Sequence, residues 1–185
     1  MAEVPWPVWA AIWEDDLAAA DHDAIGTLLA RCFPRSRTPF GPGRSWASGR
    51  PEVRLLARCG SRVVAHLGVL RRFLRVDAAA RLVGDVGLVG VDPSRQGTGL
   101  GGELLVRGRA LLDELGMPFG FLTCGHHVSG FYATGGWAEV TGGTRMVRAD
   151  GTVQVYGAAS MVLPVHAPLA QWPHGRRVDR NGLEL

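Results

Sequence analysis

The spacing of apolar residues changes along the chain between the period of two that is typical of strands and the period of about 3.6 that is typical of helices. Runs rich in Val, Leu, Ile and aromatic residues, bounded by turn-forming residues, predict a series of strands. They lie at about 7–13, 52–59, 62–76, 81–91, 118–124, 143–149 and 152–165. Gly60 and Ser61 predict a tight turn between the second and the third of them.

Other segments show helical spacing. Residues 21–33 begin with Asp21 or Asp23 as an N-cap and carry apolar residues three and four positions apart. A longer helix is expected at about 99–115 and a short one around 128–137. The resulting order is neither a regular βαβ alternation nor an all-β series. We therefore predict an α/β fold in which helices flank a mixed, mostly antiparallel sheet.

Length and composition bound the class of protein. With 185 residues, of which 46% are hydrophobic, the chain can bury one core but not two ordinary ones, so residues 1–185 are expected to form a single domain. No apolar run approaches the roughly 20 residues that a membrane span needs. The first residues also lack a basic leader, so we expect a cytoplasmic protein without a membrane partner. The 3 cysteines lack metal-ligand spacing and an even count, which predicts free thiols and no bound metal.

Charge limits the partners further. The net charge is only +3, and the arginines are scattered rather than gathered in one run, which argues against nucleic acid and for a smaller anion. A loop rich in Pro, Gly, Ser and Arg runs from Pro34 to about Pro51, and loops of that length usually have a function or are mobile. The sequence leaves a homodimer open.

The stretch VGLVGVDPSRQGTGLGGELL, residues 86–105, carries the densest chemical signal. An apolar strand reaches Asp92 and Pro93, and glycines crowd the start of the next helix. Such glycines let successive N–H groups converge on an anion, for which diphosphate is the natural ligand. The pattern G-x-G-x-x-G is also present, but the next strand ends in Thr123 and Cys124 rather than in an acidic residue, which disfavours a dinucleotide-binding fold. A tight turn without a ligand is the remaining alternative.

The segment from Gln96 to Gly101 fills the pattern Q/R-x-x-G-x-G/A directly after a V-x-P strand end. It resembles the acyl-CoA signature of the GCN5-related N-acetyltransferase (GNAT) superfamily, which implies a GNAT fold and backbone amides that hold the diphosphate of an acyl-CoA donor. Gly87 and Gly90 indicate a bulge that would splay the fourth and fifth strands apart. The donor-binding residues implied by the resemblance are Leu88, Gly90, Val91, Gln96, Gly97, Thr98, Gly99, Leu100, Gly101 and Gly102.

Three residues are candidates for acid and base. FYATGGW, residues 131–137, resembles the Y-x-x-x-G-F/W element of the superfamily, which implies that Tyr132 protonates the departing sulfur; core packing is the alternative. Asp85 shares a strand face with Gly87 and is the first candidate for the base, although an ion pair with an arginine is nearly as well supported. His66 is the second candidate, against the usual role of a hydrogen-bonded core histidine.

Blocks spanning nearly the whole chain resemble the nodulation acyltransferase NodA family. They are WEDDLAAADH, GRSWASGRPEVR, VAHLGVLRRFLRV, LGMPFGF and QWPHGRRVDRNGLEL. That family N-acylates the free amine of a de-N-acetylated glucosamine at the non-reducing end of a chitooligosaccharide, with a fatty acyl group from acyl carrier protein. The resemblance implies that the terminal block closes over the sugar, with Trp172 stacking and Asp179 or Glu184 binding the amine. A strand or coil packed at the sheet edge is the alternative for this block.

Two features depart from the NodA pattern. The glycine turn and the tyrosine element are intact here, which makes a coenzyme A thioester at least as suitable a donor as acyl carrier protein. Together with the pattern from Gly136 to Pro164, they also resemble aminoglycoside 2′-N-acetyltransferases, which bind polycations through acidic residues. The loop after the first helix has no acid before Glu52 and would repel a polycation, unless its arginines are simply solvated. These arginines are Arg35, Arg37, Arg44 and Arg50.

The sequence therefore predicts an N-acyltransferase that moves an acyl group from a thioester, acyl-CoA or acyl carrier protein, to the amine of an amino sugar. The enzyme alternative is an N-acetyltransferase that acts on an aminoglycoside or another small amine. The alternative from another class is a domain that binds acyl-CoA without turnover.

Overall fold

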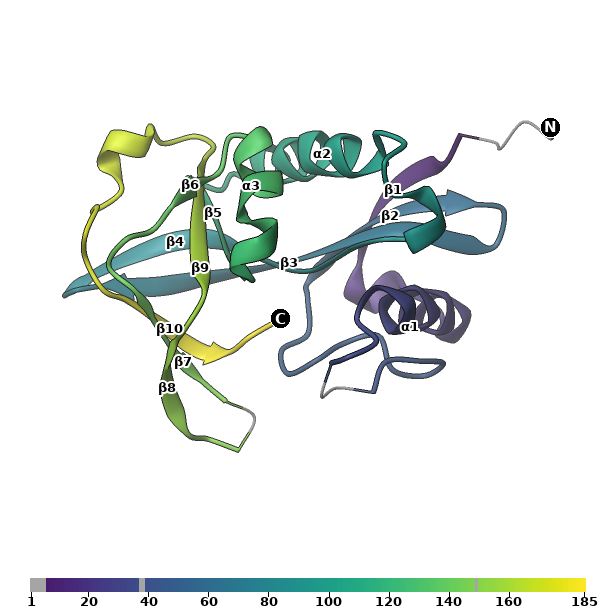
Figure 1. The fold of residues 1–185 in the computed structure, drawn as a ribbon, viewed down its shortest axis with the longest axis horizontal. Coiled ribbons are helices and arrows are strands. Elements are labelled where there is room, and N and C mark those ends of the chain that lie inside the picture. Colours follow the sequence, from purple (N-terminus) through teal and green to yellow (C-terminus); the bar gives the residue numbers. More distant parts are fainter. Residues whose placement is uncertain (1–5, 37–38, 149) are drawn as a thin grey trace.

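The computed structural model describes residues 6–36, 39–148 and 150–185, apart from the side chain of Asn181. These residues form one ten-stranded sheet with helices on both faces (Figure 1). Its strands are β1 (Val8–Trp13), β2 (Val53–Cys59), β3 (Arg62–Val76), β4 (Ala79–Val91), β5 (Phe119–Cys124), β6 (Ala138–Glu139), β7 (Thr144–Val147), β8 (Val153–Tyr156), β9 (Ala159–Pro164) and β10 (Val178–Leu183). The helices are α1 (Ala19–Cys32), α2 (Leu100–Glu114) and α3 (His126–Thr134), with the short 3₁₀ turns η1 (Glu14–Asp16), η2 (Pro93–Arg95) and η3 (Leu169–Gln171).

The sheet is mixed and mostly antiparallel. Its main path runs β6-β9-β5-β4-β3-β10-β7-β8, while β2 pairs with the first half of β3 and carries β1. The parallel neighbours on this path are β4 with β5 and β7 with β10. The predicted α/β class with a mixed sheet and flanking helices is confirmed.

Each face of the sheet is covered by a helix whose apolar residues recur at helical spacing. Buried Ile25 and Leu29 of α1 pack against strand residues such as Leu56 on one face. On the opposite face, α2 buries residues such as Leu104 and Leu112 in a larger cluster. Figure 1 shows α1 on one side of the sheet and α2 with α3 on the other. Burial of both faces makes β3 and β4 the centre of the core.

Most element boundaries agree with the sequence, but α1 begins at Ala19, so Asp21 lies in its first turn and neither Asp21 nor Asp23 is the N-cap. The C-terminal half also differs. The single strand predicted at 152–165 is two strands, β8 and β9, separated at Gly157 and Ala158. β8 lies beside β7 at the edge of the sheet, whereas β9 pairs with β5. A continuous apolar run does not reveal that the chain changes neighbours within it, because both halves satisfy the same pattern. The end of the predicted strand 143–149, at Ala149, lies outside the described residues.

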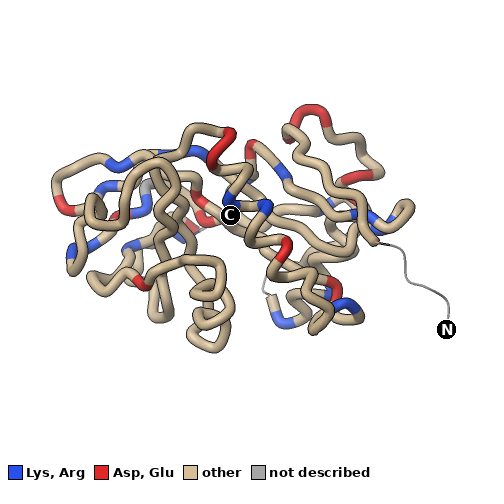
Figure 2. The backbone as a smooth tube through the Cα atoms, turned by 90° about the horizontal axis from the view of Figure 1, so that it is seen from above, with Lys and Arg blue, Asp and Glu red and all other residues tan. Residues whose placement is uncertain are grey.

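The terminal segment also joins the sheet. β10 pairs with β3 on one side and with β7 on the other, so it lies inside the sheet rather than along its outer edge. Figures 1 and 2 both place the C-terminus near the middle of the molecule, between its two ends. Figure 2 also shows Arg segments interspersed with Asp and Glu along the tube, without a one-sided basic face in this view.

β4 and β5 pair only over a short stretch, in the middle of β4 and near the start of β5. Their parallel ladder consists of Gly84 with Gly120 and Asp85 with Phe121, although both strands continue well beyond these pairs. On its other side, β4 contains a bulge, because its register with β3 shifts between the pairs of His66 and Gly68. The expected bulge and splaying of the central strands are confirmed.

None of the helices in the described residues is both long and apolar enough to cross a membrane.

Candidate active site

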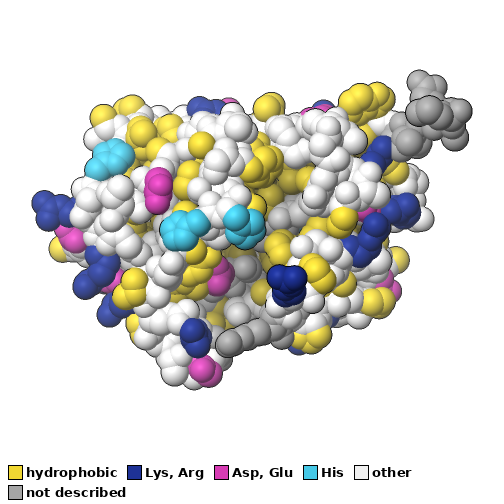
Figure 3. Space-filling view, in the orientation of Figure 1, with side chains coloured by type: hydrophobic (Ala, Val, Ile, Leu, Met, Phe, Trp, Pro, Cys, Tyr) yellow, Lys and Arg dark blue, Asp and Glu magenta, His cyan; other side chains and the backbone are white. Residues whose placement is uncertain are grey.

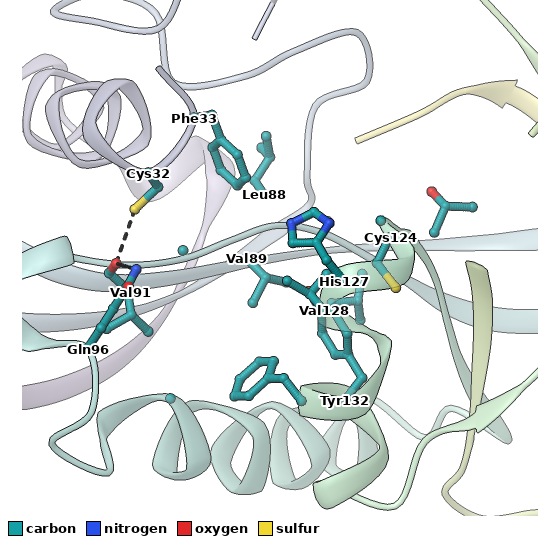
Figure 4. Close-up of a pocket in the computed structure, with 17 residues that line it drawn as sticks. Cys32, Phe33, Leu88, Val89, Val91, Gln96, Cys124, His127, Val128 and Tyr132 are labelled. Carbon is teal, nitrogen blue, oxygen red and sulfur yellow. Dashed lines mark hydrogen bonds between the residues drawn. The ribbon is translucent and has the colours of Figure 1, made fainter. Parts of the chain in front are cut away.

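A pocket of about 610 Å³ lies where β4 and β5 diverge. Its walls come from the end of α1, from β4, the start of α2, the end of β5 and α3 (Figure 4). In the space-filling view, apolar side chains gather between the two ends of the molecule, with charged and histidine side chains around them (Figure 3). The lining residues are Cys32, Phe33, Val86, Gly87, Leu88, Val89, Gly90, Val91, Gln96, Gly101, Thr123, Cys124, Gly125, His127, Val128, Phe131 and Tyr132.

The predicted donor-binding residues lie along one continuous path. Leu88, Gly90, Val91, Gln96 and Gly101 line the pocket. The others form the adjacent turn and the first turn of α2; they are Gly97, Thr98, Gly99, Leu100 and Gly102. Gly97 and Gly99 have φ of 77° and 88°, a conformation that side chains disfavour, so these two glycines allow the turn to form. Of the turn residues, Leu100 points into the core and is 3% exposed.

The turn is braced by a buried carboxylate. Asp92 accepts hydrogen bonds from the backbone N–H of Ser94 at 3.0 Å and from its hydroxyl at 2.7 Å. Arg31 and Arg62 form ion pairs with the same carboxylate at 2.5 and 3.0 Å. Burial acts to raise the pKa of Asp92, but the Ser94 hydrogen bonds and the arginines outweigh it and lower the pKa. Asp92 therefore stays ionised and fixes the start of the turn.

Tyr132 lies in α3 and faces the pocket (Figure 4). Its ring packs edge-on against Phe131 and Trp137, at centroid distances of 5.2 and 6.1 Å. Burial, together with neighbouring Cys124 and Tyr156, raises the pKa of the phenol. The hydroxyl therefore keeps its proton at neutral pH and can donate it to a group in the pocket.

Asp85 lies in a buried ion-paired cluster outside the pocket. Its carboxylate is fully buried and accepts a hydrogen bond from Nη2 of Arg180 at 2.7 Å, while Nε of Arg72 lies 3.3 Å from its other oxygen. Burial raises the pKa of Asp85, and the two guanidinium groups act against that rise. An ion pair with an arginine was the alternative to a catalytic base for this residue.

His66 is likewise fully buried and does not line the pocket. Its Nδ1 lies 2.7 Å from the carbonyl oxygen of Leu88, and its Nε2 lies 3.3 Å from Nη1 of Arg54. Burial and, to a smaller extent, the charge of Arg54 lower the pKa of His66 to about 3, while the Leu88 hydrogen bond acts against this shift. The imidazole is therefore neutral at physiological pH.

The residues predicted to bind the sugar separate in space. Glu184 is adjacent to the pocket, because its Oε1 accepts a hydrogen bond at 2.6 Å from the hydroxyl of the lining residue Thr123. Arg180 contacts the same oxygen at 3.5 Å. Asp179 instead pairs with two arginines, Arg145 and Arg177, at 2.9 and 3.4 Å.

Trp172 lies in the core and not at the pocket. It is 2% exposed, packs edge-on against Phe119 at 5.3 Å and stacks on Phe121 at 6.1 Å. No exposed ring face is left on which a sugar could stack. The structure thus brings Glu184, but neither Trp172 nor Asp179, to the candidate site.

Several lining residues were not among the predicted donor-binding, catalytic or sugar-binding residues. Cys32 and Phe33 end α1, Thr123 and Cys124 end β5, and His127 lies in the first turn of α3. They share no sequence motif and meet only through the fold, although a polar residue at the carboxyl end of a strand was a signal for Thr123. Burial raises the pKa of Cys32 and of Cys124 to about 11, so both thiols stay protonated.

Comparison with known proteins identifies the family. The sequence model of the family described as Nodulation protein A (NodA) matches residues 4–185. The chain is 37% identical to nodulation protein A of Methylobacterium nodulans, covering 96% of this chain and 89% of that protein. It is 33% identical to nodulation protein A of Rhizobium tropici, covering 96% and 97%. The chain belongs to the NodA family. The resemblance inferred from the sequence blocks is confirmed.

Solved structures show the fold of this NodA-family protein. The N-acetyltransferase YhbS of Escherichia coli, solved in complex with CoA, matches with a TM-score of 0.63 at 17% identity, covering 100% of this chain and 98% of that one. An acyl-CoA N-acyltransferase from Pseudomonas aeruginosa matches with a TM-score of 0.59 at 18% identity, covering 85% and 99%. The GNAT fold is confirmed, and this NodA-family protein is an N-acyltransferase.

Proposed function

We propose that residues 1–185 act as a single domain that transfers an acyl group from a thioester to the free amine of an amino sugar, such as a de-N-acetylated chitooligosaccharide. The observation that carries this proposal is the pocket between β4 and β5, which extends from the glycine turn to Tyr132 and Thr123. A thioester arm lying in it would have its phosphates at the N-terminus of α2 and its sulfur near a protonated phenol.

The glycine turn suits the diphosphate of a coenzyme A thioester. Gly97 and Gly99 give the turn a left-handed backbone conformation, which would let the N–H groups at the start of α2 face one region, where the helix dipole adds positive potential. A phosphopantetheine arm on acyl carrier protein shares the thioester and the pantetheine chain but lacks this diphosphate. We therefore favour acyl-CoA as the donor. Acyl carrier protein is the alternative donor, and the activity test described below includes both.

In the proposed reaction, the neutral amine attacks the thioester carbonyl carbon and forms the C–N bond. Backbone N–H groups at the β4 bulge would polarise the carbonyl oxygen. As the C–S bond breaks, Tyr132 donates its proton to the departing sulfur, while the proton lost by the amine passes to a carboxylate. Holding both reactants together supplies much of the rate, on the order of 7 kcal/mol or more.

Glu184 is the carboxylate that we assign to the acceptor amine. One of its oxygens is held by Thr123 and contacted by Arg180, and its side chain is 37% exposed. Asp85 supports this arrangement from the core, because it pairs with the same Arg180. Leu185 packs against Gly87 so closely that a Cβ there would overlap it, which holds the terminal segment against the pocket wall.

The loop beside Glu184 favours an acceptor with a single amine. The N–H of Gly49 donates to the carbonyl oxygen of Glu184 at 2.6 Å, so the loop borders the acceptor side. Arg44 and Arg50 lie over the ring of Trp46 in this loop, at 5.9 and 4.6 Å. Their charges would repel an aminoglycoside with several ammonium groups. Arg37 of the same loop lies outside the described residues.

The activity test offers short and long acyl-CoA thioesters, and acyl carrier protein loaded with the same chains, to the purified protein. The acceptors are a de-N-acetylated chitooligosaccharide and a panel of aminoglycosides, and products are read by mass spectrometry. We expect the sugar to gain the mass of one acyl group and the aminoglycosides to remain unchanged. Acylated aminoglycosides without acylated sugar would instead establish the alternative substrate. If calorimetry shows no binding of either donor, the transferase mechanism at this pocket is refuted.

A pair of variants separates the two carboxylates. Glu184→Gln should lower kcat by about 10²- to 10⁴-fold, as expected for loss of a general base, without changing the melting temperature. Asp85→Asn should instead destabilise the protein by about 3–5 kcal/mol, because it removes the buried negative charge that pairs with Arg180 and Arg72. A stable Asp85→Asn protein that has lost its activity would return the role of base to Asp85.

A further inference from the structure

The β4 bulge contains a strained residue at the centre of the pocket wall. Leu88 has φ of +54°, a left-handed conformation that is unusual for a residue with a branched side chain, and it is 7% exposed. Such conformations cost about 1–3 kcal/mol and persist only where surrounding contacts enforce them. One such contact is made by the carbonyl oxygen of Leu88, which accepts a hydrogen bond from Nδ1 of His66 at 2.7 Å.

Arg54 determines which nitrogen of His66 carries the proton. A guanidinium group can only donate, so Nε2, which lies 3.3 Å from Nη1 of Arg54, must accept. In a neutral imidazole the proton is then on Nδ1, where it is donated to the Leu88 carbonyl. Arg54 is itself fixed in the core: it is fully buried and binds both carboxylate oxygens of Glu14, at 2.7 and 3.0 Å.

The geometry of the peptide bond transmits this contact to the pocket. The Leu88 carbonyl shares a planar peptide unit with the N–H of Val89, and in a trans peptide these two groups point in opposite directions. The Val89 N–H is therefore directed away from His66. Val89 lines the pocket, and β5 no longer pairs with β4 at this level. The N–H thus lies where the slot for the thioester opens.

We propose that His66 is a positioning residue, whose Nδ1–H, fixed by Arg54, holds the Leu88–Val89 peptide so that the Val89 N–H polarises the thioester carbonyl. The inference rests on the proposed function, and it gives His66 a role different from that of a base. A base would need a free lone pair in the pocket. Both nitrogens of His66 are already engaged, and the side chain is fully buried.

Two substitutions by amide side chains distinguish the contact made by Nδ1 from the contact made by Nε2. In His66→Asn, the side-chain N–H₂ occupies the place of Nδ1 and can still donate to Leu88. In His66→Gln, the amide reaches the place of Nε2, where it can accept from Arg54 but leaves the Leu88 carbonyl without its donor. We expect His66→Gln to lose about 10²-fold in kcat, the effect of a misplaced group, with unchanged donor KM, and His66→Asn to keep most of the rate.

The controls are circular dichroism and calorimetric titration of CoA, which should show the same fold and donor affinity in both variants. Equal rates of the Asn and Gln variants, or a Gln variant that loses donor affinity rather than kcat, would overturn the inference. An inactive wild-type protein would instead count against the proposed function, which keeps the two failures apart.

A spectroscopic test needs neither variant nor acceptor. Nitrogen NMR of the ¹⁵N-histidine-labelled wild-type protein should show that His66 is neutral and protonated at Nδ1 from pH 6 to pH 8. A proton on Nε2, or a doubly protonated ring in this range, would refute the proposed positioning, because the Leu88 carbonyl would then be held by a different arrangement.

Discussion

At the scale of single residues, Tyr132 provides the clearest test of chemistry. Its phenol is buried beside the pocket and has a raised pKa, so it remains a proton donor throughout neutral pH. Tyr132→Phe keeps the ring packing but removes that proton. We expect kcat to fall by about 10²- to 10⁴-fold, as for loss of a general acid, while calorimetry shows unchanged donor affinity. A variant with the wild-type rate would assign Tyr132 to core packing alone.

His66 also predicts how stability depends on pH. Its pKa in the folded protein is about 3, against 6.5 for the unperturbed group, so below pH 6.5 the unfolded chain binds a proton that the folded protein does not. The contribution of His66 is thus present above pH 6.5 and is lost as the pH falls toward 3. Between pH 7 and pH 5 the free energy of unfolding should drop by about 2 kcal/mol. In His66→Asn this part of the drop, measured by urea denaturation, should disappear.

Residue positions could be predicted from the sequence where a motif fixes the local backbone. The turn from Gln96 to Gly101 and the position of Tyr132 at the pocket followed from such motifs. The position of the strained residue could not be predicted in this way. Gly87 and Gly90 indicated the bulge, but the positive φ belongs to Leu88, which lies between them. What holds it there is a contact between strands, which no spacing along the chain encodes.

At the scale of elements, the turn before α2 should depend on its backbone rather than on its side chains. Gly99 has φ of 88°, so Gly99→Val should cost about 1–3 kcal/mol of strain or reshape the turn. In either case the N–H groups that we propose to bind the diphosphate would be displaced, and the affinity for CoA should fall. Gly102→Ala, in the first turn of the same helix, has open space around its Cβ and keeps its N–H, so it should bind CoA as the wild type does. Equal affinities of the two variants in calorimetry would place the diphosphate elsewhere.

Helices and strands whose apolar residues follow one regular period could be predicted from the sequence. Strands whose neighbours in the sheet come from distant parts of the chain could not. β3, β4 and α2 agree with their patterns because each buries a regular apolar face. The insertion of β10 between β3 and β7 depends on ion pairs such as Arg180 with Asp85, 95 positions apart. A sequence shows that such charges exist, but not which of them meet.

At the scale of the whole molecule, the two halves of the sheet are joined by a short seam. β4 belongs to the half that packs against α1, and β5 belongs to the half that contains β9. The two strands share two ladder pairs before they diverge. The pocket fills the remaining gap and takes its walls from both halves. A donor bound there would add contacts across the seam that the chain alone does not make.

This arrangement predicts how a donor should stabilise the protein. A ligand that binds only the folded state raises the free energy of unfolding by about 2.7 kcal/mol at 100 times its Kd. CoA at that concentration should raise the melting temperature, and hydrogen exchange should slow most at residues 86–91 of β4 and 122–124 of β5, which flank the gap. The Gly99→Val protein, measured at the same CoA concentration, should show neither effect. Stabilisation with no change in exchange along these two strands would mean that CoA binds away from the seam.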